Sequence, residues 1–230
     1  MLIRRLPLNL IFVLFFCAFC SFAVKAQARN GVAKNNDNNT IKIAAIYAIS
    51  GEAAFSNMAH VEVAKFAVEE INAKGGVIGQ KIELIEIDNQ STALGSKIAA
   101  QKAVDLDVSA VFGPMWSSHA LGAAPVLQKA KIPMISPAAT NQKVTLVGDY
   151  IFRGSFIDPL QAKVMANYAA NDLKAKTAVV LTNVGNVHSI EIADFFINNF
   201  TKNGGKILWE GDYASTATDF KKQLEKTKKL

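Results

Sequence analysis

The stretch Lys81–Gly113, "KIELIEIDNQSTALGSKIAAQKAVDLDVSAVFG", contains one complete strand–helix–strand unit. The apolar runs at 81–88 and 108–113 predict strands, and the segment 93–105 between them predicts a helix. Strands that are joined by a helix pair in parallel, with a right-handed crossover. This unit therefore predicts an α/β fold built on a parallel sheet.

The same alternation continues on both sides of this unit. Upstream, the continuous apolar run "IKIAAIYAI" at 41–49 is typical of a parallel strand that is covered on both faces. Apolar residues at helical spacing follow between Val63 and Ile71, and Gly75-Gly76 end that helix. Downstream, the pattern predicts strands at 131–136, 150–155, 176–182 and 206–213, and helices at 118–129, 159–173, 189–204 and 217–230.

These elements predict a doubly wound α/β protein with two Rossmann-like or flavodoxin-like lobes, each on a parallel sheet. We place lobe 1 at 41–155 and lobe 2 at 156–230, because the strand–helix cycle restarts after residue 155. Lobe 2 is expected to be incomplete, since its few elements do not cover both faces of a sheet.

Residues 1–28 have the pattern of a cleaved signal peptide. Arg4 and Arg5 precede a short apolar core, and "AQA" at 26–28 supplies the small residues of a cleavage site after Ala28. An uncleaved membrane anchor is the alternative interpretation of this segment. The asparagine-rich stretch 29–40 that follows predicts a disordered leader.

The composition argues against several classes of site. Cys17 and Cys20 are the only cysteines and lie in the signal segment, so the exported chain has neither disulfides nor thiolate metal ligands. The three histidines lack metal-ligand spacing and no phosphate-loop motif is present, so neither a metal nor a cofactor is expected. Five lysines crowd the last ten residues without interleaved aromatic residues, which is typical of a solvated helix face and not of a nucleic-acid site.

The predicted strand order points to three loops as the place for a ligand. In a flavodoxin-like sheet of order 2-1-3-4-5, ligands bind beyond the carboxyl ends of the strands, where the strand order reverses. There the sequence has "SGEAAFSN" at 50–57, "GPMWSSHA" at 113–120 and "SPAATN" at 136–141. All three loops are rich in small and hydroxyl residues.

Two of these loops offer complementary groups to a zwitterion. Ser117 or Ser118 begins a helix, and the free N–H groups of a helix start favour a carboxylate, although a helix cap alone also explains this serine. The Ala138 carbonyl would accept from an ammonium group, and Thr140 would donate to a carboxylate or accept from the ammonium. A capped turn is the alternative for the second loop. Together the loops predict a site for the head group of an α-amino acid.

Several motifs in the sequence resemble those of a known protein family. The runs "SGEAAF", "EEINAKGGVIGQKIELIEID" and "GPMWSSHALGAAPVLQKAKIPMISPAATNQKVT" resemble type I periplasmic solute-binding proteins of branched-chain (Leu/Ile/Val) amino-acid ABC transporters. The segments "FRGSFIDPLQAKVMANYA" and "HSIEIADFFINNFTKNGGKI" are similar to that family's hinge and to the start of its second lobe. The resemblance extends over about 41–230 and implies a chain that is truncated in its second lobe.

The resemblance implies a ligand site position by position. Ser117 would bind the ligand carboxylate, while the segment Ala138, Ala139 and Thr140 would bind the carboxylate and the ammonium together. The family's acidic partner for the ammonium comes from a later part of the second lobe than this chain reaches.

Other positions would shape the pocket for the ligand side chain, and here the chain departs from the family pattern. Phe55 or Ser56 stands where relatives often have tyrosine, and Trp116 stands where they have a smaller residue. His188 replaces the tyrosine of a Tyr-Gly pair in the second lobe. The expected ligand is therefore an amino acid whose side chain the sequence does not specify, with a branched-chain residue as the default.

The resemblance implies a periplasmic protein without enzymatic activity. Such a protein captures a small amino acid or related amide by closing its lobes and delivers it to a membrane ABC permease, with no cofactor and, after signal cleavage, no membrane span. A ligand-sensing protein of the same fold that reports to a regulator or receptor is the alternative. A secreted hydrolase is a third possibility, but the chain has no G-x-S-x-G elbow to support it.

Overall fold

The computed structural model describes residues 40–230. The predicted signal peptide at 1–28 and the leader up to residue 39 lie outside the described residues, whereas Thr40 is already part of the first strand. Within the described part of the chain, no helix has both the length and the apolar character needed to cross a membrane.

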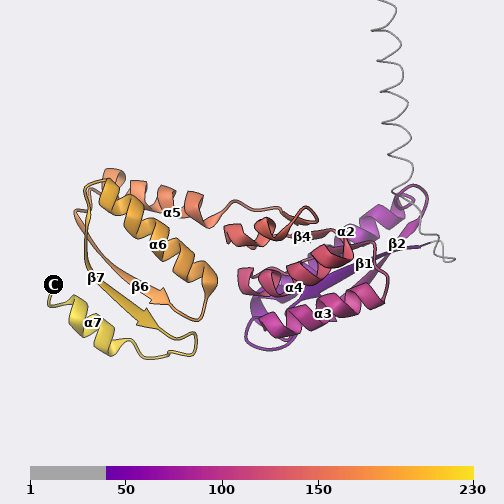
Figure 1. Ribbon diagram of the computed structural model, residues 1–230, viewed down its shortest axis with the longest axis horizontal. Helices are drawn as coiled ribbons and strands as arrows, with labels where there is room; N and C mark the ends of the chain where they lie inside the picture. The colour runs from indigo at the N-terminus through magenta and orange to yellow at the C-terminus, as the bar shows by residue number, and fades with distance from the viewer. Residues whose placement is uncertain (1–39) are drawn as a thin grey trace, which may run out of the picture. The chain divides into compact units, whose positions relative to one another are not determined.

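A parallel five-stranded sheet forms the first part of the fold (Figure 1). Its strands lie in the order β2-β1-β3-β4-β5, which confirms the flavodoxin-like order that was predicted. The strands are β1 (Thr40–Tyr47), β2 (Lys81–Asp88), β3 (Ala110–Phe112), β4 (Met134–Ser136) and β5 (Ile151–Arg153). All four pairings are parallel, so the loops after these strands open at one edge of the sheet.

Helices cover both faces of this sheet, as the apolar run of β1 indicates. Helices α3 (Ala93–Asp105) and α4 (Ser117–Ala130) pack against each other over one face, where Ala44 and Ile46 of β1 belong to the larger core cluster. Helix α2 (Ala54–Ala73) lies on the opposite face, where Ala45 and Tyr47 pack in a smaller cluster. The alternation of β1 side chains between the two clusters follows from the two-residue period of a strand.

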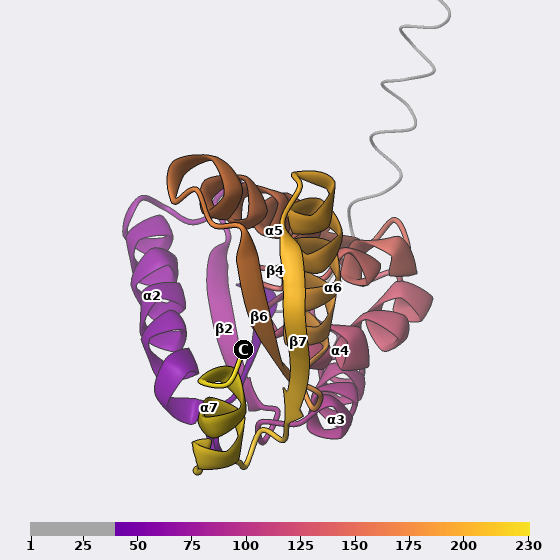
Figure 2. The same ribbon diagram turned by 90° about the vertical axis from the view of Figure 1, so that its left-hand side faces the viewer.

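The second part of the fold is built on a parallel pair of strands, β6 (Thr177–Asn183) and β7 (Lys206–Tyr213). Figure 2 shows β6 beside β7, with helix α6 (Val187–Lys202) behind them. Helix α5 (Asp158–Asn167) packs on α6, and the short helix α7 (Lys221–Thr227) follows β7.

The helix boundaries differ from those expected from the sequence in two places. Helix α2 begins at Ala54, well before the apolar pattern that starts at Val63. Its first turns are largely exposed, so no apolar pattern in the sequence marks them. The helix predicted at 159–173 is α-helical only to Asn167 and ends in a wider π-type segment, Tyr168–Asp172. Strand β5 ends at Arg153 and helix α5 begins at Asp158, and the lobe boundary at 155–156 between them stays a prediction.

Candidate functional site

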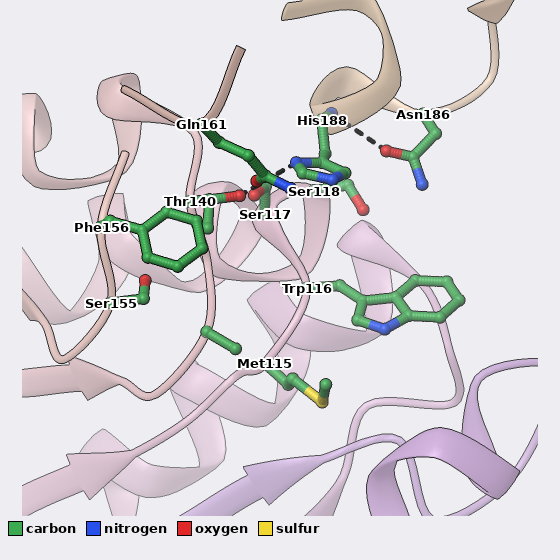
Figure 3. Close-up of a pocket in the computed structure, with 11 residues that line it drawn as sticks. Met115, Trp116, Ser117, Ser118, Thr140, Ser155, Phe156, Gln161, Asn186 and His188 are labelled. Atoms are coloured by element: carbon green, nitrogen blue, oxygen red, sulfur yellow. Dashed lines mark hydrogen bonds between the residues drawn. The ribbon is translucent and has the colours of Figure 1, made fainter. Parts of the chain in front are cut away.

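The loops at the carboxyl edge of the five-stranded sheet border a cavity of about 430 Å³ (Figure 3). Its walls come from the segment before α4, the loop after β4, the segment between β5 and α5, and the start of α6. The lining residues are Met115, Trp116, Ser117, Ser118, Ala138, Thr140, Ser155, Phe156, Gln161, Asn186 and His188. The cavity is thus where the strand order places a ligand in an open α/β sheet.

Ser117 is the first residue of α4 and is only 5% exposed. Its Oγ accepts a hydrogen bond from the backbone N–H of Asn141 at 3.2 Å. Because that bond occupies an acceptor position of the hydroxyl, the hydroxyl hydrogen remains available to donate. The preceding residue, Trp116, makes no side-chain capping bond to the helix, so the start of α4 keeps its N–H groups for another acceptor.

Thr140 and His188 meet across the cavity wall, although 48 positions separate them in the sequence. Thr140 Oγ1 lies 2.9 Å from His188 Nδ1, and Asp158 Oδ1 lies 2.7 Å from the same ring nitrogen. In a Ser–His–Asp triad the hydroxyl and the carboxylate contact opposite ring nitrogens. These three residues therefore do not have the geometry of an activated nucleophile.

Two carboxyl groups lie beneath this contact. The Asp158 side chain is fully buried, and within residues 40–230 its Oδ2 has no hydrogen-bond partner. Glu191 is 9% exposed, and its Oε2 accepts from the backbone N–H of Gln142 at 3.3 Å. Burial, together with the neighbouring Asp158 carboxyl, raises the pKa of Glu191. Glu191 is therefore the member of the pair that holds a proton more readily than an ordinary glutamate.

Arg153 fixes the loop that carries Thr140. It is the only arginine in residues 40–230, and it donates to the carbonyls of Ala139 and Asn141 at 3.0 and 2.8 Å. It also donates to the Gln142 carbonyl at 3.0 Å and to the Thr145 hydroxyl at 2.6 Å. The planar, five-donor guanidinium suits this fan of acceptors, which a lysine would not satisfy.

The structure brings five of the eight predicted site residues to one cavity: Trp116, Ser117, Ala138, Thr140 and His188. Ala139 is fully buried and lies behind the wall. Its backbone N–H donates to Ser136 Oγ at 3.1 Å, and its carbonyl accepts from Arg153, so its backbone groups serve the loop itself.

The other two predicted residues lie away from this cavity, in the first turn of α2. Phe55 is 96% exposed, and Ser56 donates its hydroxyl hydrogen to the Ala53 carbonyl at 3.0 Å. Neither is among the residues that line the cavity. Their role in a side-chain pocket stays a prediction.

Sequence reasoning did not single out several residues that line the cavity, namely Met115, Ser155, Phe156, Gln161 and Asn186. Ser155 and Phe156 lie in the "FRGSFIDPLQ" segment, which the sequence indicates only as a hinge motif. Asn186 caps α6 by accepting from two backbone N–H groups, and an asparagine before an apolar helix pattern is a signal that could have located it. Ser155 Oγ is buried and has no hydrogen-bond partner within residues 40–230, so it remains free to contact a ligand.

Comparison with protein families and curated proteins gives consistent results. A family model described as periplasmic binding protein matches residues 40–230. The leucine-specific-binding protein of Salmonella typhimurium is 32% identical over 142 residues, which cover 61% of this chain and 38% of that protein. The Leu/Ile/Val-binding protein of Escherichia coli is 30% identical over 142 residues, which cover 61% of this chain and 39% of that protein.

Solved structures of the same fold are also similar. The branched-chain amino-acid transporter substrate-binding protein of Streptococcus pneumoniae, in complex with isoleucine, has a TM-score of 0.78 and 35% identity over 83% of this chain and 54% of that chain. A solute-binding protein of an ABC transporter from Rhodopseudomonas palustris, in complex with 3,4-dihydroxybenzoic acid, has a TM-score of 0.73 and 28% identity over 84% of this chain and 52% of that chain.

The chain spans about half the length of these solved relatives and about two fifths of the curated ones. The family model and the similarity to leucine- and branched-chain-binding proteins confirm the resemblance drawn from the motifs. Because the family model matches the whole of residues 40–230, the chain belongs to the periplasmic binding protein family.

Proposed function

We propose that this chain captures a small carboxylate-bearing ligand, an amino acid in the first place, as an extracytoplasmic solute-binding protein. The observation that carries the proposal is that Ser117 and Thr140 line one cavity. The hydroxyl oxygen of Ser117 contacts the backbone nitrogen of Asn141, and that of Thr140 contacts His188 Nδ1. With the uncapped start of α4 beside them, these hydroxyls form a cluster of donors that matches a carboxylate.

The solved relatives support the choice of a carboxylate. Isoleucine and 3,4-dihydroxybenzoic acid, the ligands of two of them, differ in size and in charge but share a carboxylate. A donor cluster on lobe 1 would bind the carboxylate, and the rest of the cavity would determine which carboxylate ligand is preferred.

For an amino acid, the cavity offers neutral acceptors to the ammonium. Ala138, with its backbone carbonyl, and Gln161, with its side-chain amide, are among the lining residues, and no aspartate or glutamate is among the lining residues within 40–230. Trp116 and Phe156 supply apolar surface for the ligand side chain. This lining suits an apolar or aromatic side chain better than a charged one.

Within the proposal, the lobes close over the ligand and the closed form is recognised by a membrane ABC permease, which places the protein in the periplasm after signal cleavage. Ligand sensing on the same fold is the alternative, because fold alone does not separate the two functions. Genes for a permease and an ATPase beside this one favour transport, whereas a sensor-kinase gene favours signalling.

The test is calorimetric titration of the exported chain with L-leucine, L-isoleucine, L-valine and 3,4-dihydroxybenzoate. Ser117→Ala and Thr140→Val should each weaken the binding of the preferred ligand at least tenfold, about 1.4 kcal/mol. L-leucinamide, which lacks the carboxylate, should bind more weakly than L-leucine for the same reason.

The matched control is Thr201→Val, which removes an exposed hydroxyl from α6. Thr201 is not among the residues that line the cavity. It should leave affinity unchanged. Unchanged affinity in both Ser117→Ala and Thr140→Val would remove these residues from the site and contradict the proposal.

A further inference from the structure

Asp158 is a fully buried carboxyl group that contacts the ligand-binding wall from behind. It is the first residue of α5, and its backbone N–H donates to the Thr140 carbonyl at 3.0 Å. Its Oδ1 lies 2.7 Å from His188 Nδ1, which in turn lies 2.9 Å from Thr140 Oγ1. Asp158 therefore holds Thr140 twice, once through the backbone and once through the imidazole of His188.

Asp158 lies beside a helix N-terminus and a guanidinium group. It sits in the first turn of α5, where the helix dipole and the free N–H groups stabilise a negative charge. Arg153 of β5 is close enough to interact electrostatically with both Asp158 and Glu191. Burial and the neighbouring Asp158 carboxyl raise the pKa of Glu191, so Glu191 holds a proton more readily than an ordinary glutamate.

Asp158 keeps one oxygen without a hydrogen-bond partner. Its Oδ2 is buried and has no partner among the described residues, which is costly for a carboxylate. The Glu191 carboxyl neighbours that of Asp158, and a protonated Glu191 is a hydrogen-bond donor.

An ionised Asp158 fixes the tautomer of His188. Because a carboxylate only accepts hydrogen bonds, His188 Nδ1 must carry a hydrogen at 2.7 Å from Oδ1. Thr140 Oγ1, 2.9 Å from the same nitrogen, then shares that hydrogen as an acceptor. Its own hydroxyl hydrogen cannot point at Nδ1 and remains available for another acceptor at the cavity, where Figure 3 shows Thr140 and His188 side by side.

We propose that Asp158 is a positioning residue that, through His188, leaves the hydroxyl hydrogen of Thr140 free to donate to the carboxylate of the ligand. The inference rests on the proposed function and deepens it. The sequence alone left Thr140 free to donate or to accept, and the contact with His188 favours donation. The hydroxyl hydrogen of Ser117 is likewise available to donate, since one acceptor position of its oxygen is filled by the Asn141 N–H.

The first test reads the tautomer of His188 directly, without any ligand. In ¹⁵N-resolved NMR of the exported chain, neutral His188 should carry its hydrogen on Nδ1, with its signals assigned by their loss in His188→Phe. Asp158→Asn, which removes the charge at nearly constant size, should shift the population toward the form with hydrogen on Nε2. A wild-type His188 with its hydrogen on Nε2 would overturn the proposal.

The second test reads the consequence for binding. Asp158→Asn should weaken binding of the preferred carboxylate probe at least tenfold in the wild-type background. In a His188→Phe background the same exchange should change affinity less than twofold, because Asp158 acts through the imidazole. An equal loss in both backgrounds assigns Asp158 a merely structural role and overturns the proposal.

Asp149→Asn is the matched control, since Asp149 is exposed and absent from the cavity lining. It should alter neither the tautomer nor the affinity. The two proposals fail separately: if Ser117→Ala weakens binding but Asp158→Asn changes neither reading, only the positioning role is lost. If Ser117→Ala and Thr140→Val leave affinity unchanged, the carboxylate site itself is lost.

Discussion

Glu191 makes the native state sensitive to pH through a single proton. The groups that act on it are Asp158 at the start of α5, Arg153 of β5 and Gln142, and Asp158 in turn contacts His188. Since its pKa is raised in the folded chain, the native state keeps a proton that the unfolded chain loses first. The stability due to this proton is fully present below the ordinary glutamate pKa and is lost as the pH rises through the raised value.

Glu191→Gln should therefore be more stable than the wild type at neutral pH and of similar stability near pH 4, because glutamine mimics the protonated side chain. Urea denaturation of both chains between about pH 4 and about pH 8 measures the difference. The exchange Glu225→Gln at an exposed position of α7 is the control and should give no pH-dependent gain. A wild-type stability that rises relative to the glutamine variant with increasing pH would contradict the assignment of the proton.

At the scale of the elements, the sequence was sufficient where burial alone determines structure. The strand order and the start of α4 at Ser117 followed from apolar runs and turn residues, because a parallel sheet buries its strands on both faces. The contacts of Thr140 with His188 and of Glu191 with Gln142 join segments that are almost 50 positions apart. No local pattern encodes such contacts, so Arg153, Asp158 and Ser155 were not recognised as parts of the site. The isolated arginine among lysines was the one available signal for Arg153.

Arg153 ties the loop between β4 and β5 at four acceptors. Arg153→Lys would leave most of its four acceptors unpaired, and an unsatisfied buried acceptor costs about 1–3 kcal/mol. We expect a loss of about 2–4 kcal/mol in the free energy of unfolding, together with weaker ligand binding because the loop carries Thr140. Urea denaturation and calorimetry measure the two effects. The control is the reverse exchange at an exposed site of α4, Lys129→Arg, which should change stability by less than about 0.5 kcal/mol. An equally small change for Arg153→Lys would show that the hydrogen bonds of Arg153 are dispensable.

At the scale of the whole described chain, the two faces of the five-stranded sheet are covered unequally. On the face of α2, a row of side chains crosses the sheet through Ala45, Phe112, Ile135 and Phe152, which are paired in register. Helix α2 packs on β1 and β2, so Ala45 is fully buried, while Ile135 and Phe152 are 46% and 49% exposed. A purely apolar groove of about 260 Å³ lies between α2 and the strands, with Ile135 on its border. Contiguous apolar surface of this kind binds amphiphilic dyes and promotes association.

The double exchange Ile135→Thr with Phe152→Thr should therefore lower the fluorescence of bound anilinonaphthalene sulfonate and reduce light scattering on concentration. The cost in stability should stay below about 3 kcal/mol in total, because both side chains are only half buried and threonine retains a strand-forming, β-branched shape. Leu146→Thr, which replaces a 76% exposed leucine of the 3₁₀ segment Gln142–Val147, is the control. It should alter neither measurement, since that leucine belongs neither to the groove nor to the row of paired strand residues. Dye binding that is unchanged in the double variant would place the accessible apolar surface elsewhere, and the unequal cover of the sheet would then have no consequence in solution.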